Sequence, residues 1–306
     1  MRIAYLVNRY PATSQSFIRR EIEAVEAQGA EVFRFSIRPA DLAALPDPRD
    51  QAELSRTETI LTAGSLRLVL RLAGRFLRHP RRGVRAVQTA FARVEWKVTP
   101  LIRRVAYLAE AAELAARMRA LGVDHLHAHF GTNPAMVARI AREWSGIPYS
   151  FTVHGPDEFD LPGPLDLAGK IADARFCVAI SSFGRSQLMR WSAFDDWGKI
   201  EVVRCGVDGM FLGDDVSSPV PAAPRLCAVA RLSAQKGIPL LIEAAKRLRD
   251  EGRHFELVLI GDGEMRGEIE QIVGQYDLGA IVRITGWARA DEVVGHLSEA
   301  RAMVLP

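Results

Sequence analysis

The sequence alternates short apolar runs, rich in Val, Ile and Phe, with longer stretches that carry apolar residues at helical spacing. Strands buried on both faces of a parallel sheet are continuous apolar runs, and the connection between two such strands is usually a helix. The pattern therefore predicts an α/β chain with helices on both faces of doubly wound parallel sheets. The runs lie at residues 2–7, 31–37, 123–128, 149–153, 175–180 and 200–204, and then at 226–230, 255–260, 281–285 and 301–305.

A stretch rich in Pro, Ser and Ala, residues 216–224, separates the two groups of predicted strands. This composition is typical of a semi-rigid connection between domains, and a chain of 306 residues is long for one domain. We therefore predict a first domain over residues 1–208, a linker over 209–224 and a second domain over 225–306. The second domain is expected to be incomplete, because the chain ends where a strand ends.

Composition excludes several classes of protein. No apolar run approaches the roughly 20 residues that span a bilayer, and the chain begins directly with a predicted strand rather than a secretory signal. We therefore expect a cytoplasmic protein. Cys177, Cys205 and Cys227 are odd in number, widely spaced and set in apolar stretches, so they are expected to be buried reduced thiols rather than disulfides or zinc ligands.

The net charge of +3 conceals a basic segment, residues 66–104, which contains ten arginines and one lysine but only one acidic residue, a glutamate. A helix over residues 66–78 would carry its arginines on one arc and most of its apolar residues on the other. The arginines are Arg67, Arg71, Arg75 and Arg78, and the apolar residues are Leu66, Val69, Leu70, Ala73, Phe76 and Leu77. Such a helix either docks on an anionic membrane or packs on its domain with a solvated basic face. Nucleic acid is not an expected partner, because aromatic residues are sparse and no recognition motif is present.

Polar residues that follow the predicted strands are candidates for ligand binding, because ligands gather at the carboxyl ends of parallel strands. Thr13, Ser14 and Ser16 either cap the next helix or let its backbone approach an anion or a sugar. His154 ends a strand before a Gly-Pro turn, as scaffold or as a residue facing the ligand. His125, His127 and His129 share one strand face, but no nearby carboxylate completes a ligand set, so no metal site is predicted.

Two cations mark the second half of the chain. Arg231 and Lys236 bracket the loop between a predicted strand and a helix that carries Pro239 in its first turn. Cations beside the positive end of a helix repel it, so either a phosphate lies between them or they are a solvated surface pair. Gly261, Gly263 and Gly267 are spaced one residue too long for a dinucleotide fingerprint, which disfavours NAD.

Taken in order, the motifs resemble retaining glycosyltransferases of family 4, the group-one glycosyltransferases, which have the GT-B architecture of two facing Rossmann-like domains. The resemblance covers essentially the whole chain, and its opening is similar to that of bacterial exopolysaccharide and colanic-acid-type transferases. The motifs are YPATSQSFIRREI, HLHAHFG, FTVHGPDEF, CGVDGMF, ARLSAQKGIPLLIEA and LIGDGE. The resemblance implies an acceptor-side domain over residues 1–208, with a basic helical insertion at about 64–120, and a nucleotide-sugar-binding domain over 225–306.

The resemblance also implies an activity: transfer of a sugar, with retention, from a UDP- or GDP-sugar to a glycan or lipid-linked glycan acceptor, in exopolysaccharide or other cell-surface glycan synthesis. No cofactor or metal is expected, and the chain has no Asp-x-Asp motif. Arg231 and Lys236 match the pair that holds the donor diphosphate, and His154 matches the histidine that faces the donor sugar. Ser14, Gln15 and Ser16 match the loop near donor and acceptor. Further candidates for the donor cleft are Gly131, Asn133, Asp157, Gly261 and Gly263.

The sequence departs from the family pattern at its end. The family continues with a Glu-x7-Glu motif and a final helix that returns to the first domain, and neither is present in the 306 residues. We therefore expect a fragment whose own activity stays open, peripheral at most to the inner face of a membrane. A non-catalytic nucleotide-sugar-binding or scaffold protein of the same fold is the alternative, and a nucleotide-sugar epimerase is a weaker one.

Overall fold

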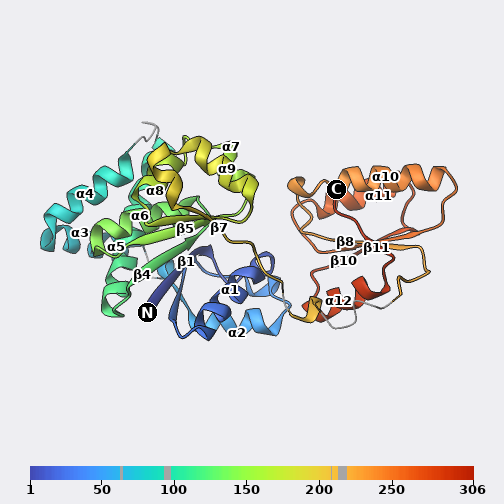
Figure 1. Ribbon diagram of the computed structural model, residues 1–306, viewed down its shortest axis with the longest axis horizontal. Helices are drawn as coiled ribbons and strands as arrows, with labels where there is room; N and C mark the ends of the chain where they lie inside the picture. The colour runs from blue at the N-terminus through green and yellow to red at the C-terminus, as the bar shows by residue number, and fades with distance from the viewer. Residues whose placement is uncertain (63–64, 93–97, 208, 213–218) are drawn as a thin grey trace. The chain divides into compact units, whose positions relative to one another are not determined.

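The computed structural model describes residues 1–62, 65–92, 98–207, 209–212 and 219–306, which form two compact units (Figure 1). Unit 1 comprises Met1–Asp41 and Ala52–Gly206, and unit 2 comprises Leu42–Gln51 and Val207–Pro306. Parts of the predicted basic segment and linker, residues 93–97 and 213–218, lie outside the described residues.

Unit 1 is built on a seven-stranded parallel sheet with the order β3-β2-β1-β4-β5-β6-β7. The strands are β1 (Arg2–Arg9), β2 (Glu31–Arg38), β3 (Thr57–Thr59), β4 (His125–His129), β5 (Tyr149–Val153), β6 (Phe176–Ala179) and β7 (Ile200–Val202). The strand order reverses between β1 and β4, and parallel sheets usually bind ligands at the carboxyl ends of the strands beside such a reversal. The apolar runs predicted every strand of this sheet except β3, which is short and polar.

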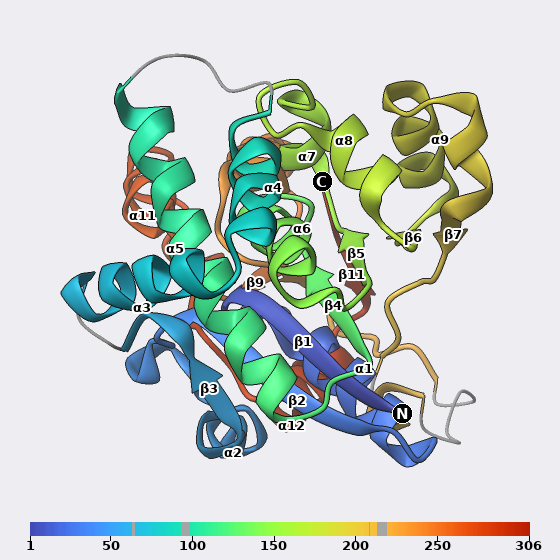
Figure 2. The ribbon, with the colours of Figure 1, turned by 90° about the vertical axis from the view of Figure 1, so that its left-hand side faces the viewer.

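Helices cover both faces of this sheet. They are α1 (Ser16–Ala27), the part of α2 (Pro48–Arg56) from Ala52 onward, α3 (Ser65–Arg78), α4 (Pro80–Phe91), α5 (Val98–Ala120), α6 (Asn133–Ser145), α7 (Pro156–Asp160), α8 (Leu167–Asp173) and α9 (Ser182–Trp191). Figure 2 shows α4, α5 and α6 side by side, and α6 packs on β1 and β4. The main core lies on this face, and Leu126, Phe151 and Trp144 belong to its buried cluster.

The opposite face of the sheet is covered by α1. Tyr5 and Val7 of β1 pack there against Ile18 and Ile22 of α1. Successive strand residues point to opposite faces, so the three β4 histidines at every second position, all buried, share the α1 face. This face is therefore apolar near β1 and polar along β4.

The packing of α3 differs from the predicted arcs. Phe76, placed on the apolar arc, packs inward, with its ring centre 5.1 Å from that of Trp144 in an edge-to-face arrangement. Arg71 pairs with Glu113 of α5, and burial lowers the pKa of Arg75, so the arginines do not form one fully solvated face. Leu66 and Arg67 lie where the side chains are not described; among the described side chains of α3, the large apolar residues left exposed are Val69, Leu70 and Leu77.

Unit 2 contains a four-stranded parallel sheet with the order β10-β9-β8-β11. The strands are β8 (Arg225–Val229), β9 (Glu256–Ile260), β10 (Val282–Gly286) and β11 (Ala302–Met303), and the helices are α10 (Ile238–Asp250), α11 (Arg266–Gln275) and α12 (Ala290–Glu299). One face packs against α10 and α11, and the other against α12 (Figure 1). The predicted doubly wound pattern is confirmed in both units.

Cysteine burial agrees with the sequence in part. Cys177 of β6 and Cys227 of β8 are buried reduced thiols, as predicted. Cys205 is also reduced but exposed, because it follows β7 in an extended segment rather than lying in a sheet. Among the described residues, no helix combines the length and the apolar character needed to cross a bilayer.

Candidate functional site

His154 follows β5 at the carboxyl edge of unit 1. Its Nε2 lies 2.9 Å from Nδ1 of His129, and the rings of Phe17 and Phe130 lie 4.8 Å from its own. Burial, reinforced by repulsion from His129, lowers the pKa of His154 to about 3, so the imidazole is neutral near pH 7. Phe130 adopts a left-handed conformation with φ of 73°, which is costly for a bulky residue. The edge is thus held in a strained, fixed geometry.

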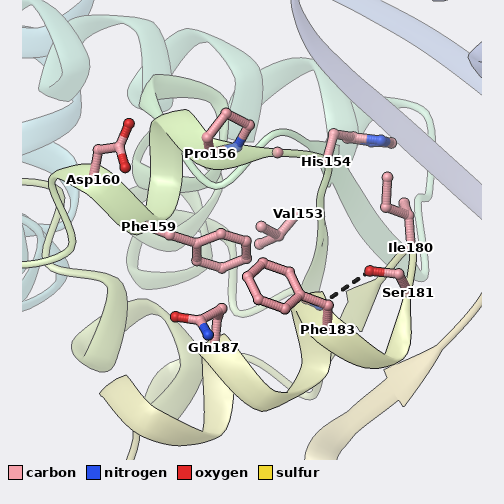
Figure 3. A pocket seen from close by; sticks show the side chains of 11 residues that line it. Val153, His154, Pro156, Phe159, Asp160, Ile180, Ser181, Phe183 and Gln187 are labelled. Carbon is pink, nitrogen blue, oxygen red and sulfur yellow. Dashed lines mark hydrogen bonds between the residues drawn. The ribbon is translucent and has the colours of Figure 1, made fainter. Parts of the chain in front are cut away.

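A cavity of about 370 Å³ opens beside His154 at the carboxyl ends of β5 and β6 (Figure 3). The rings of Phe159 and Phe183 face each other in it, and Asp160 and Gln187 supply polar groups at its border. Small-molecule sites are typically mostly apolar with a few polar groups that fix orientation, as here. A second cavity of about 260 Å³ shares His154 and extends to Glu21 and His127.

The β4 histidines belong to a buried polar network with Glu21 of α1. The Tyr5 hydroxyl donates to Glu21 Oε1 at 3.0 Å, and His129 Nε2 lies 3.4 Å from the same oxygen. Burial alone would raise the pKa of Glu21, but its interactions with the imidazoles of His129 and His127 and with the Tyr5 hydroxyl outweigh burial and lower the pKa to about 2. The prediction that no carboxylate lies near the histidines is therefore wrong, because folding brings α1 over β4.

Gly131 and Asn133 hold the loop after β4. Gly131 donates its N–H to Glu158 Oε1 at 2.9 Å and accepts at its carbonyl from Lys170 Nζ at 2.6 Å. Asn133 Nδ2 donates to Asn8 Oδ1 at 2.8 Å. Sequence reasoning missed Lys170, whose pKa burial lowers to about 7. Its signal was a lone lysine in an otherwise apolar helical stretch.

The loop between β1 and α1 leaves polar groups without a capping role. Neither the 3-10 turn Thr13–Gln15 nor α1 has a side-chain hydrogen bond at its N-cap. Ser14 is exposed, Gln15 Oε1 is buried without a hydrogen-bond partner among the described residues, and Ser16 Oγ accepts from Arg20 at 3.3 Å. Helix capping therefore does not account for these residues. Asp157, another predicted candidate, is exposed in the first turn of α7.

Arg231 and Lys236 both lie in the loop between β8 and α10 of unit 2. Both side chains are exposed, and within the described part of the chain neither makes an ion pair with a carboxylate. The N-cap of α10 is Gly237, in a left-handed conformation and without a side-chain cap. The buried hydroxyl of Ser233, missed from the sequence, has no hydrogen-bond partner among the described residues. Two cations thus sit near an uncapped helix N-terminus.

Gly261 and Gly263 support this loop through backbone contacts. A Cβ on Gly261 would lie 2.0 Å from the carbonyl oxygen of Ala230, and one on Gly263 would lie 2.4 Å from that of Leu232. The N–H of Leu232 donates to the carbonyl of Asp262 at 2.9 Å. The glycines are therefore needed for close packing of two loops.

Two family models match adjacent parts of the chain: "Glycosyltransferase Family 4" over residues 67–209 and "Glycosyl transferases group 1" over residues 217–306. The amylovoran biosynthesis glycosyltransferase AmsK of Erwinia amylovora is 31% identical over 112 residues, which cover 35% of this chain and 26% of AmsK. The putative colanic acid biosynthesis glycosyltransferase WcaL of Escherichia coli is 24% identical over 338 residues, covering 100% of this chain and 75% of WcaL. The matched stretches are thus about a quarter of AmsK and three quarters of WcaL.

Solved structures share the fold. Anabaena HepE in complex with UDP-glucose superposes with a TM-score of 0.64 at 15% identity, over 99% of this chain and 73% of HepE. The apo form of the lipopolysaccharide outer core galactosyltransferase WaaB gives 0.59 at 17% identity, over 100% of this chain and 74% of WaaB. These likenesses confirm the predicted GT-B fold class.

Proposed function

Since the chain belongs to the group 1, family 4 type of glycosyltransferases, we propose that it transfers a sugar from a UDP- or GDP-sugar to an acceptor hydroxyl with retention of configuration. The names of AmsK and WcaL refer to the synthesis of amylovoran and colanic acid. By analogy, the acceptor is a glycan or lipid-linked glycan in the assembly of an exopolysaccharide or another cell-surface polymer.

The observation that carries the proposal is that Arg231 and Lys236, the two exposed cations before α10, form no ion pair with a described carboxylate. Arg231 can bind a phosphate through two parallel hydrogen bonds, and Lys236 supplies a point charge. The positive end of α10 adds to the same field. A diphosphate would neutralise all three, whereas without an anion they repel one another.

The same cations would promote the chemical step. Cleavage at the anomeric carbon builds negative charge on the leaving diphosphate, and fixed cations stabilise that charge more in the transition state than in the ground state. The loss of one such group typically lowers the rate by ~10²–10³-fold. In this role they replace the divalent metal that an Asp-x-Asp motif would hold, so the proposed transfer needs no metal at the diphosphate.

Unit 1 would supply the sugar-facing groups. His154 is neutral and fixed by His129, so it can exchange a hydrogen bond with a sugar hydroxyl without an ionic charge. The cavity beside it presents Phe159 and Phe183, whose rings suit the apolar C–H face of a pyranose. Asp160 and Gln187 can bond hydroxyls at its rim. We assign this cavity to the acceptor sugar.

Isothermal titration of UDP and GDP at low salt tests the diphosphate site. We expect one nucleotide to bind the parent chain, and the Arg231→Ala, Lys236→Ala variant to lose most of that affinity. Arg253→Ala, which removes another exposed arginine of unit 2, serves as the control and should bind like the parent. Equal binding by the double variant, or no binding by the parent, would contradict the site. Binding without sugar transfer would indicate the non-catalytic alternative.

We also propose that α3 attaches unit 1 peripherally to an anionic membrane. Leu70 and Leu77 are 63% and 85% exposed, on a helix that also carries arginines. Apolar burial and cation attraction act together at such a surface, with each cation near it contributing about 1 kcal/mol. This placement would suit a lipid-linked acceptor.

Sedimentation with phosphatidylglycerol vesicles tests this attachment. The Leu70→Glu, Leu77→Glu variant should lose most of the bound fraction, whereas Leu240→Glu, at an exposed leucine of unit 2, should not. Unchanged sedimentation of the double variant would refute the role of α3, as would a parent chain that stays in solution.

A further inference from the structure

A carboxylate and two imidazoles converge between α1 and β4. One donor atom from each of Glu21, His127 and His129 lies within 4.8 Å of the others. Glu21 Oε1 is 3.4 Å from His129 Nε2 and 4.0 Å from His127 Nε2. Carboxylate oxygen and imidazole nitrogen are common ligands of zinc and of similar divalent ions.

The spacing suits a shared ion better than direct contact. Charge-assisted hydrogen bonds usually measure about 2.7–2.9 Å, which is shorter than either distance. Ligand atoms around a tetrahedral zinc, with bonds of about 2.0–2.2 Å, lie roughly 3.3–3.6 Å apart. The Glu21–His129 distance falls in this range, and rotation of the Glu21 side chain would bring the Glu21–His127 distance close to it.

His129 supplies an independent observation. Its side chain is fully buried, and its Nε2, which faces Glu21, has no hydrogen-bond partner among the described residues. Buried polar atoms are nearly always satisfied, so an unsatisfied nitrogen needs an explanation. A bound ion would provide the missing partner.

The surroundings resemble those of a metal site. His127 Nδ1 lies 2.7 Å from Ser150 Oγ, and His129 Nδ1 lies 2.9 Å from His154 Nε2. In both rings, Nδ1 is therefore held by a neighbour while Nε2 faces Glu21. Ligating histidines are usually held in this way. His127 Nε2 also contacts Thr152 Oγ1 at 2.9 Å, and an ion would displace this hydroxyl, which can rotate.

We propose that Glu21, His127 and His129 bind one divalent transition metal ion of the zinc type. The cavity of about 260 Å³, lined by Glu21 and His127, gives water access to the remaining coordination position. The ion would fix α1 on β4 and hold His129, and through His129 the orientation of His154. The site is separate from the cation pair of unit 2 and does not rest on the proposed sugar transfer.

Metal titration of the full chain, with any affinity tag removed, tests the site. We expect Zn²⁺ to bind with one-to-one stoichiometry and to raise the unfolding temperature. Co²⁺ should give the intense visible absorption of a four-coordinate ion, which Zn²⁺ then bleaches. Glu21→Gln and His129→Gln should weaken binding by more than the ~10- to 100-fold that loss of a ligand's hydrogen-bonding partner costs.

Matched controls are Glu23→Gln, at an exposed carboxylate of α1, and His125→Gln, at a buried histidine of β4 outside the donor set. Both should bind Zn²⁺ like the parent. If the folded parent chain binds no stoichiometric Zn²⁺ or Co²⁺, the proposal fails and the network is one of hydrogen bonds alone. Retained binding in Glu21→Gln and His129→Gln would equally overturn it.

Discussion

The two units place polar side chains at the same edge of their sheets but in opposite states. In unit 1, His127 is buried and His154 is half-buried, and both are bonded to neighbours and neutral. In unit 2, Arg231 and Lys236 are exposed and charged, and no described carboxylate pairs with them. The unit 1 side chains His127 and His154 already have protein partners, whereas the two cations of unit 2 lack a described carboxylate partner. This difference supports the proposal that unit 1 orients a neutral ligand and that unit 2 binds an anion.

The largest expected effect comes from removing the side chain of His154 at the sheet edge of unit 1. His154→Ala should lower the rate of UDP or GDP release from the matching nucleotide sugar by about 10²–10³-fold, within the range typical of a positioned catalytic group. Nucleotide affinity in titration should change little, because the cation pair of unit 2 is intact.

The matched control for His154→Ala is His125→Ala on the same polar face. His125 is buried and bonded to Ser150 at 2.7 Å, but it lies at the start of β4, away from the carboxyl edge. Its loss should lower stability and leave the rate unchanged. Equal rates for the parent and His154→Ala would assign His154 a scaffold role.

The next-largest expected effect is a loss of stability of unit 1 at acid pH. Burial, with repulsion from His129, lowers the pKa of both His127 and His154 to about 3 in the folded chain. Between that value and about 6.5 only the unfolded chain binds these protons, so stability is lost as pH falls. Each histidine contributes a slope of up to about 1.4 kcal/mol per pH unit. Urea unfolding between pH 4.5 and 7.5 measures it.

One further group bears on this prediction. Glu110, whose pKa burial raises to about 7, acts in the opposite direction, because its stabilisation is lost as pH rises from about 4.5. His127→Gln should reduce the acid slope. Stability of unit 1 that is constant or rises on acidification would contradict neutral, buried histidines.

The smallest expected effect concerns Gly263, which packs against the loop that carries Arg231 and Lys236. Gly263→Ala brings a Cβ within 2.4 Å of a backbone oxygen, so it should destabilise unit 2 by about 1–3 kcal/mol and weaken nucleotide binding. Gly267→Ala, in α11 with nothing within 4 Å, should stabilise unit 2 slightly. Thermal unfolding of both variants is the measurement, and similar values would show that the loop tolerates the side chain.

Much of the fold followed from the sequence because its signals are local. Apolar runs between helical stretches predicted both parallel sheets, and the position of residues after strands selected His154, Arg231 and Lys236. The roles of these residues toward a ligand stay predictions. β3 was missed because Thr57–Thr59 is too short and polar to form an apolar run.

Tertiary structure decided which distant groups meet. Spacing put the β4 histidines on one face, but only the packing of α1 brought Glu21 to them, and only the burial of α8 directed Lys170 to the carbonyl of Gly131. Helical periodicity predicts which residues of α3 share a face. Which face points outward depends on its packing against α5 and α6. Periodicity fixes where residues lie within an element, whereas the neighbours of each face depend on contacts between elements far apart in the chain.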